Sequence, residues 1–496
     1  MLKTIIAKEF LNNILNLRFI IGLVLCTIVT IACIMILAHD YRREMKDYNA
    51  RMNLQDEILD NYAKANRHRL LGMVRTQKPP ERFRPLIIGI PGNEDLGFFD
   101  YNPLPILFPP LDFLFIVTII MSLLAMLFSY DAIAGERQSG TLRLVISNSI
   151  SRTTILFGKL VGGTASLLIP FILALLVGVL YVSVNPSIQW DSSAWVELAL
   201  LTAASITFIT LFYLLGLMIS TFSKYSAISI LNCLFLWVLL ILVIPNVCPY
   251  ISAQLCRISS IKQTERQLEE IKINSIKAAG ERIKESAKKL RSQYGTLFSE
   301  FESMKFGGIG SFYIFGRDLD PKYQKAAQQR ANADPEFKAM MDAFHEEHKK
   351  ARDESFRIQN ELGDKVRGDL ATKAALQTKL AKNLACISPF ANFVYVARDL
   401  TGTGLRSLDY YEQTKDEYER QLRSYAEEKI DDARKKDPAL EDESLLDVSD
   451  RPRFVFKEEV LKDKLNEILP YWGILVLFNV VFFVAAFAGF VRYDVR

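Results

Sequence analysis

The sequence predicts an all-α polytopic membrane protein with six transmembrane helices. Half of its 496 residues are hydrophobic and 23% are charged, but the charges are absent from six long apolar windows and dense between them. A helix needs about 20 residues to cross a hydrocarbon core about 30 Å thick, and it satisfies its own backbone polar groups there. The predicted transmembrane helices cover residues 19–38, 111–130, 160–184, 195–221, 225–247 and 467–491.

Residues 1–18 predict an amphipathic helix that lies in the membrane interface before the first span. Their apolar residues recur at spacings near the helical period of 3.6, at Ile5, Ile6, Phe10, Ile14 and Leu17. An ordinary cytoplasmic lead-in is the alternative. A secretory signal is disfavoured, because the apolar run that follows has about 20 residues, whereas a signal core has about 7–15.

Lys and Arg in the short connections set the predicted orientation, because such loops stay in the cytoplasm. They fall before the first span, between the second and third, between the fourth and fifth, and after the sixth, at Lys3, Lys8, Arg18, Arg137, Arg143, Arg152, Lys159, Lys224, Arg492 and Arg496. Both termini, the 131–159 segment and the 492–496 tail are therefore predicted to be cytoplasmic. Residues 39–110 and 248–466 are predicted to lie on the other side of the membrane.

The 39–110 segment predicts a charged helix followed by a proline-rich return to the membrane. The 248–466 segment predicts a large helical domain with a coiled-coil-like seam. The first long helix of that domain has apolar residues in steps of three and four, at Ile276, Ala279, Ile283, Ala287, Leu290, Tyr294, Leu297 and Phe301.

After the break "GGIGSFYIFG", a second long helix over 334–384 is predicted to pack antiparallel on the first. A third helix is predicted over 407–435, and "RFVFKEEV" predicts a short strand or a turn into the last span. The seam is either the core of one extracytoplasmic domain or a rigid rod that reaches a partner. Core packing is the favoured interpretation.

The cysteines and histidines give no metal-binding pattern. His345 and His348 in "HEEH" lack a further nearby ligand, so a solvated charged face is favoured over a metal site. Cys248 and Cys256 fall on the extracytoplasmic side, where a disulfide can form, and free thiols are favoured for them. We expect no metal and no cofactor bound by this chain.

The stretch "SYDAIAGERQSGTLRLVISNSISR" lies between the second and third spans. Residues 136–147 predict about three helical turns with a narrow apolar stripe, formed by Leu142, Val145 and Ile146. Gly135 and Gly140 weaken a helix by about 1 kcal/mol each relative to alanine, but they let another surface approach closely. Either a partner clasps this helix and moves both spans, or the helix lies on lipid headgroups.

The sequence "AGERQSGTLRLVISNSISRTTILFGKLVG" resembles the coupling segment of type-two ABC exporter permeases, closest to the group found with copper-enzyme maturation systems. That family has an acidic residue, a "GTL"-like turn, an "SR" and a "GK" that enters the third span. The matching positions are Glu136, Gly140, Thr141, Leu142, Ser151, Arg152, Gly158 and Lys159. The proline often seen before the "SR" is replaced by Ser149-Ile150. "NPLPILF", "ISPFANFVYVARDLTGTG" and "FVRYDVR" also resemble the family.

The resemblance implies a permease that performs no chemistry and is driven by a separate ABC ATPase dimer, which holds ATP and Mg²⁺. No GxxxxGK[ST] phosphate-binding loop occurs in this chain. Two ATPase clefts imply a second permease copy, identical or related, in a bacterial cytoplasmic (inner) membrane. The residues expected to couple to the ATPase are Gly135, Glu136, Arg137, Gly140, Thr141, Leu142, Arg143 and Arg152.

Hydroxyl side chains in the fourth span are candidates for lining a pathway, at Thr202, Ser205, Thr207 and Thr210. Hydroxyls bonded to their own helix backbone are the favoured alternative. "GKLVG" at 158–162 has two glycines spaced for close helix contact. Because no charge is expected inside a span, lipid-like or peptide cargo is favoured over an ion relay.

Two other functions stay open. The same ATPase movement could pass through the outer helices to an extracytoplasmic protein without transport, which is mechanotransmission. The chain could also be a membrane anchor or receptor that works without an ATPase. Membrane lipids are expected partners in each case, and no nucleic acid is expected.

Overall fold

The computed structural model describes residues 2–63, 65, 67–90, 111–147, 151–185, 188, 190–306, 329–437 and 444–492. It separates into two compact units, which are described in turn. The membrane unit comprises residues 1–248 and 383–496, and the helical-pair unit comprises residues 249–382. The "NPLPILF" stretch, the "GGIGSFYIFG" break and the tail beyond residue 492 lie outside the described residues.

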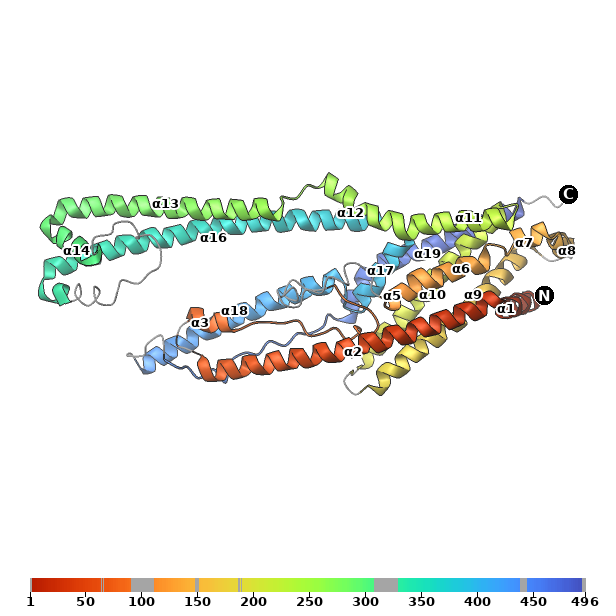
Figure 1. Cartoon of the computed structure of the whole chain (residues 1–496), viewed down its shortest axis with the longest axis horizontal. Coiled ribbons are helices and arrows are strands. Elements are labelled where there is room, and N and C mark those ends of the chain that lie inside the picture. The colour runs from red at the N-terminus through yellow and green to blue at the C-terminus, as the bar shows by residue number, and fades with distance from the viewer. Residues whose placement is uncertain are drawn as a thin grey trace. The chain divides into compact units, whose positions relative to one another are not determined.

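Helices make up the membrane unit, and no strand occurs among the described residues (Figure 1). Its elements are α1 (Leu2–Ile14), α2 (Leu17–Tyr62), α3 (Arg67–Met73), α5 (Phe113–Phe115), η2 (Ile116–Met121), α6 (Ser122–Ser129), α7 (Ala134–Gln138), α8 (Thr141–Ser147), α9 (Arg152–Val184), α10 (Ser192–Phe222), α11 (Ser226–Trp237), η3 (Val238–Val243), α17 (Pro389–Leu400), α18 (Leu405–Lys436) and α19 (Leu461–Val491). The helix α12 (Ile244–Leu255) leads into the second unit.

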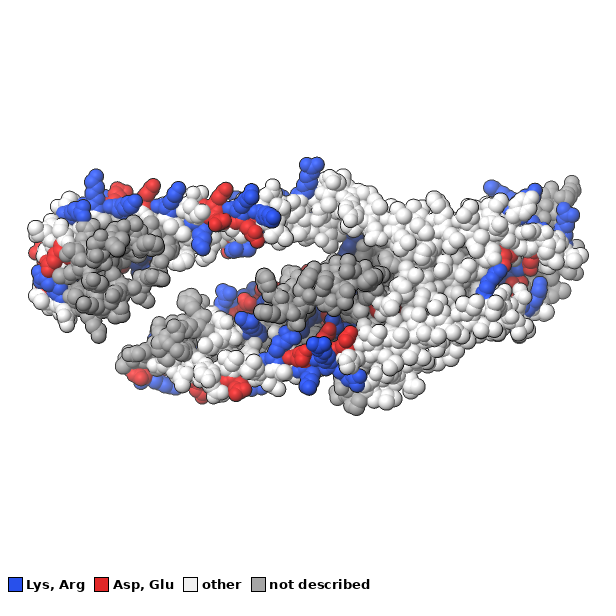
Figure 2. All heavy atoms as spheres, in the orientation of Figure 1, with Lys and Arg blue, Asp and Glu red and all other residues white. Residues whose placement is uncertain are grey.

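Six helical stretches in the described residues are long and apolar enough to cross a membrane, one for each predicted span. They are Leu17–Tyr62, Phe113–Gln138, Arg152–Val184, Ser192–Phe222, Ser226–Leu255 and Leu461–Val491. Lys, Arg, Asp and Glu are absent from a broad band over these helices on the face shown in Figure 2. The prediction of an all-helical, multi-pass membrane protein is confirmed.

The core of the membrane unit is centred on α10, which packs against α6, α17 and α19. Phe208 of α10 is fully buried and stacks on Phe393 of α17, with 4.7 Å between the ring centroids. The helix α17 therefore belongs with the spanning helices, although its sequence lies within the predicted outer segment 248–466. That segment is divided between the two units at residue 383.

The first span continues without a break far beyond the apolar window, because α2 runs from Leu17 to Tyr62. At its polar end, the buried Arg451 donates to Asp56 and Asp60 at 2.5 Å each. The backbone of Ala63 accepts a hydrogen bond from Leu446 N at 2.8 Å. The predicted third helix is α18, and "RFVFKEEV" adopts neither helix nor strand.

The helical-pair unit consists of α13 (Ile261–Tyr294), α14 (Thr296–Phe306) and most of α16 (Pro335–Ala385). Ala279 and Ile283 of α13 pack on Ala351, whereas Leu290 packs in a cluster with Met341 and other residues nearer the start of α16. This order shows an antiparallel pair, as predicted. Leu362 of α16 is 43% exposed and belongs to neither of these clusters. Cys248 and Cys256 are both free thiols.

Candidate coupling site

The coupling segment, residues 131–159, begins with two short helices and not with the continuous helix that the sequence predicts. The helix α7 ends at Gln138 and α8 begins at Thr141. Gly140 between them has φ +77°, a conformation that favours glycine because it has no Cβ. The three-turn helix is therefore broken at Gly140, and α7 and α8 meet at a corner.

A buried lysine joins three helices at this end of the membrane unit. Lys159 of α9 is 2% exposed, and its Nζ lies 2.9 Å from Glu9 Oε1 of α1 and 2.8 Å from Glu136 Oε1 of α7. A buried charge is tolerated when opposite charges and hydrogen bonds surround it. Glu136 therefore faces inward, where it ties α7 to α1 and α9.

The glycines of "GKLVG" let α1 lie directly on α9. A Cβ at Gly162 would come within 2.8 Å of the Ile6 carbonyl oxygen, and one at Gly158 within 2.6 Å of Ile5 Cγ2. The predicted close helix contact is confirmed, and its partner is α1 of the same chain. On another face of α9, Tyr213 of α10 donates a hydrogen bond to the Lys159 carbonyl at 3.0 Å.

Two arginines of the segment cap the ends of other spanning helices. Arg137 donates to the carbonyls of Thr221 and Ser223 at 3.1 and 3.0 Å, at the C-terminus of α10. Arg152 donates to the carbonyls of Phe490 and Val491 at 2.9 and 2.7 Å, where α19 ends. The last carbonyls of a helix lack intrahelical partners and carry partial negative charge, so arginine suits both positions.

The turn into α7 is fixed to its neighbours in the same way. Ser220 Oγ of α10 accepts from the backbone N–H groups of Ile133 and Ala134 at 3.0 and 2.9 Å. Arg18 at the start of α2 donates to Asp131 Oδ2 at 2.9 Å. Gly135 packs beside Asp131 and Ser226. The segment is thus bonded to α1, α2, α9, α10 and α19.

What remains at the surface is a small face around the corner. Gly140, Thr141, Arg143 and Leu144 are exposed, and we call these four residues the docking face; Leu144 is 69% exposed. Leu142 between them is fully buried in the core of the membrane unit. Of the eight residues expected to couple to an ATPase, three lie on the docking face and the other five point inward or pack against neighbours.

The hydroxyls proposed for a pathway bond mainly to their own helix. Thr202, Ser205 and Thr207 donate to the carbonyls four residues earlier at 2.8, 2.8 and 2.9 Å. Thr207 Oγ1 also accepts from Trp472 Nε1 at 3.3 Å. Thr210 is half-buried. These contacts match the alternative in which such hydroxyls satisfy the helix backbone.

The expectation that spans carry no charge needs a correction. Glu197, inside the predicted span 195–221, is 1% exposed and accepts from Lys464 of α19 at 2.7 Å. Lys464 is 2% exposed and also donates to the Leu400 carbonyl at 3.2 Å. Glu197 directly precedes the charge-free run that begins at Leu198, and Lys464 lies four residues before the run that begins at Ile468, so the sequence gives no sign of their pairing.

Comparison with known proteins relates this chain to a family of membrane transport proteins. A family model described as ABC-2 family transporter protein matches residues 3–495. A shorter stretch is similar to the "Probable ABC transporter permease protein NosY" of Stutzerimonas stutzeri, at 47% identity over 47 residues. That stretch covers 10% of this chain and 17% of the length of that protein.

Proposed function

Because the chain belongs to the ABC-2 family of transporter proteins, we propose that it is the permease subunit of an ATP-driven exporter in a bacterial cytoplasmic membrane. Both termini and the coupling segment face the cytoplasm. A separate ATPase dimer holds ATP and Mg²⁺, and a second permease copy supplies the second coupling segment. The middle of each described span is free of charge, and this composition favours lipid-like or peptide cargo.

The observation that carries this proposal is the bonding of the coupling segment to five helices. An ATPase that binds the docking face pushes on α8, and the buried Lys159 cluster passes the displacement to α1 and α9. The arginine caps pass it to the ends of α10 and α19. A loosely attached loop would absorb the same push without moving the spans.

Arg143→Glu tests the docking face without touching the inward bonds. We expect it to lower co-purification of the ATPase from host membranes several-fold, because it reverses the charge at the exposed corner. The matched control is Arg266→Glu on the exposed surface of α13, which should leave co-purification unchanged. An unchanged ATPase yield with Arg143→Glu would contradict the docking assignment. Recovery of the native chain without any nucleotide-binding subunit would support an anchor or receptor.

Mechanotransmission is the second candidate, and the unbroken α2 favours it. A displacement of α1 or α2 at the coupling end would travel along one rigid helix to Asp56 and Asp60, which Arg451 holds. Spin labels at the polar ends of α2 and α18 would report ATP-linked movement. Movement without cargo transport in vesicles would favour this function, and transport that stimulates ATP hydrolysis would favour the exporter.

A further inference from the structure

A non-helical segment lies across the membrane unit at the end of the spans away from the coupling segment. We call residues 78–90 the cap segment. Phe83 and Ile87 are fully buried and Leu86 is 3% exposed, and all three belong to the main core cluster of the spanning helices. Phe83 also contacts Trp190, with 5.2 Å between the ring centroids.

Charged side chains fix the cap segment at several points. Arg82 lies 2.5 Å from Asp191 at the start of α10, forms an ion pair with Glu458 before α19, and is 3.6 Å from Glu197. Arg84 forms an ion pair with Glu44 of α2. Arg82 therefore bridges α10 and the entry to α19, next to the buried Glu197–Lys464 pair.

Backbone groups in the second half of the cap segment form hydrogen bonds with other parts of the membrane unit. Ile88 N donates to Asp112 Oδ2 at 3.2 Å, and Phe113 N donates to the Leu86 carbonyl at 2.9 Å. Ile90 N donates to the Thr403 carbonyl at 3.2 Å, in the loop between α17 and α18. None of these bonds belongs to a regular helix or sheet ladder, so individual hydrogen bonds, the ion pairs of Arg82 and Arg84, and three apolar side chains hold the segment.

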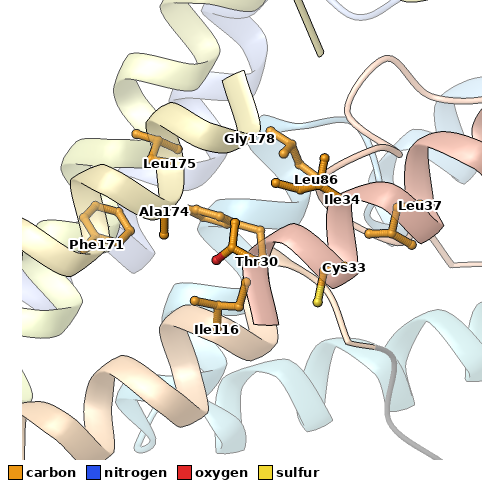
Figure 3. Close-up of a pocket in the computed structure, with 11 residues that line it drawn as sticks. Thr30, Cys33, Ile34, Leu37, Leu86, Ile116, Phe171, Ala174, Leu175 and Gly178 are labelled. Carbon is orange, nitrogen blue, oxygen red and sulfur yellow. The ribbon is translucent and has the colours of Figure 1, made fainter. Parts of the chain in front are cut away.

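Beneath the cap segment is a hollow between α2 and α9 (Figure 3). Leu86 forms its roof, and Cys33, Leu37 and Gly178 line its sides. Thr30 at the same hollow is 4% exposed, and its hydroxyl finds no hydrogen-bond partner among the described residues. Its neighbour Thr27 donates to the Leu23 carbonyl at 2.8 Å. A buried hydroxyl without a hydrogen-bond partner is unfavourable, and lifting Leu86 would let water reach it.

We propose that the cap segment is a lid over this end of the bundle, with Arg82 as its anchor. Closed, it covers the hollow between α2 and α9 with Leu86, while Phe83 and Ile87 pack in the core of the spanning helices. Open, it exposes Cys33 and Thr30. The lid is a property of this chain and requires neither an ATPase nor a cargo, so it stands apart from the proposed function.

Cys33 is a built-in reporter, because it is 2% exposed and lines the hollow under Leu86. The full chain, with the other cysteines replaced, is placed in vesicles and treated with N-ethylmaleimide. We expect Arg82→Ala to raise the labelling rate of Cys33 about tenfold or more, because the variant removes the ion pairs that hold the cap segment to Asp191 and Glu458. Arg82→Lys, which keeps the charge, should give a smaller increase.

The matched reporter is a chain that retains only Cys26, which is fully buried on α2 and does not line the hollow. Its labelling should be unchanged by Arg82→Ala. Equal increases at Cys33 and Cys26 would mean general loosening and would overturn the lid, as would an unchanged Cys33 rate. Hydrogen exchange gives a second measurement: the amides of Leu86, Ile88 and Ile90 should exchange faster in Arg82→Ala, with α7 and α8 unaffected.

Discussion

The two ends of the membrane unit use similar chemistry for different mechanical purposes. Each end has a buried lysine paired with glutamate, Lys159 at the coupling end and Lys464 at the cap end. At the coupling end the charges join helices to helices, and arginines cap the helix termini. At the cap end the charges hold a non-helical segment through Arg82. The comparison indicates that the helices at the coupling end are built to move together as one block, whereas the cap end is built so that the cap segment can come away from the spans.

The largest effect should come from removing the charge that holds the block together. Lys159→Met leaves Glu9 and Glu136 buried without their cation, and we expect it to lower the free energy of unfolding by about 3–5 kcal/mol. Urea unfolding of the full chain in detergent measures this. Lys8→Met is the control, because Lys8 is 63% exposed and lies 3.9 Å from Glu136. Equal effects of the two substitutions would refute the claim that the buried Lys159, and not the exposed Lys8, holds the helices of the coupling end together.

A pH response should single out the cap end. Burial raises the pKa of Asp112, which accepts from the cap segment at Ile88, from 3.8 to about 6. The folded chain then binds this proton more tightly than the unfolded chain does. The contribution of Asp112 to the free energy of unfolding should therefore fall as the pH rises from about 4 to about 6. Asp112→Asn should flatten that slope in unfolding measured across this range, and an unaltered slope would count against the role of this carboxyl.

A smaller effect should separate glycines that are packed from glycines that are not. In Gly162→Ala the new Cβ would meet the Ile6 carbonyl at 2.8 Å, so α1 must shift, at a cost of about 1–3 kcal/mol. Gly473→Ala on α19 meets nothing within 4 Å and should gain about 0.5–1 kcal/mol from helix propensity. Thermal unfolding of both variants measures these two changes in stability. A neutral Gly162→Ala would show that α1 is loosely placed.

Much of the fold could be predicted from the sequence, because both of its main features depend on local patterns. Long charge-free windows predict the spans, and apolar residues spaced three and four apart predict the paired helices. The position of Gly140 at a break could not be predicted from periodicity alone, since glycine weakens a helix without fixing where it ends. The sequence also gives no indication that α17 is buried among the spanning helices. Its apolar residues fit a soluble core equally well, and its partners on α10 lie far away in the chain.

The candidate coupling segment stands out in the sequence as a region, but the contacts of its individual residues could not be predicted. Glu136, Arg137 and Arg152 are charged residues in a short connection between two spans, which is the usual pattern of a solvated surface. Their partners, Lys159 and the C-terminal carbonyls of α10 and α19, become neighbours only in the folded chain. Periodicity predicts an apolar stripe that contains Leu142 and not Leu144, whereas in the structure Leu142 is buried and Leu144 is the most exposed of the segment's described apolar residues.

Photo-crosslinking from position 144 tests the central claim most directly. A benzoylphenylalanine replaces Leu144 on the docking face, the chain is irradiated in host membranes, and the adducts are identified by mass spectrometry. The same photo-reactive residue at Ile31, on the exposed apolar side of α2, serves as the control. We expect position 144 to give an adduct with a nucleotide-binding subunit and position 31 to give lipid adducts. Lipid adducts alone from position 144, with the ATPase labelled from another part of the chain, would contradict the account.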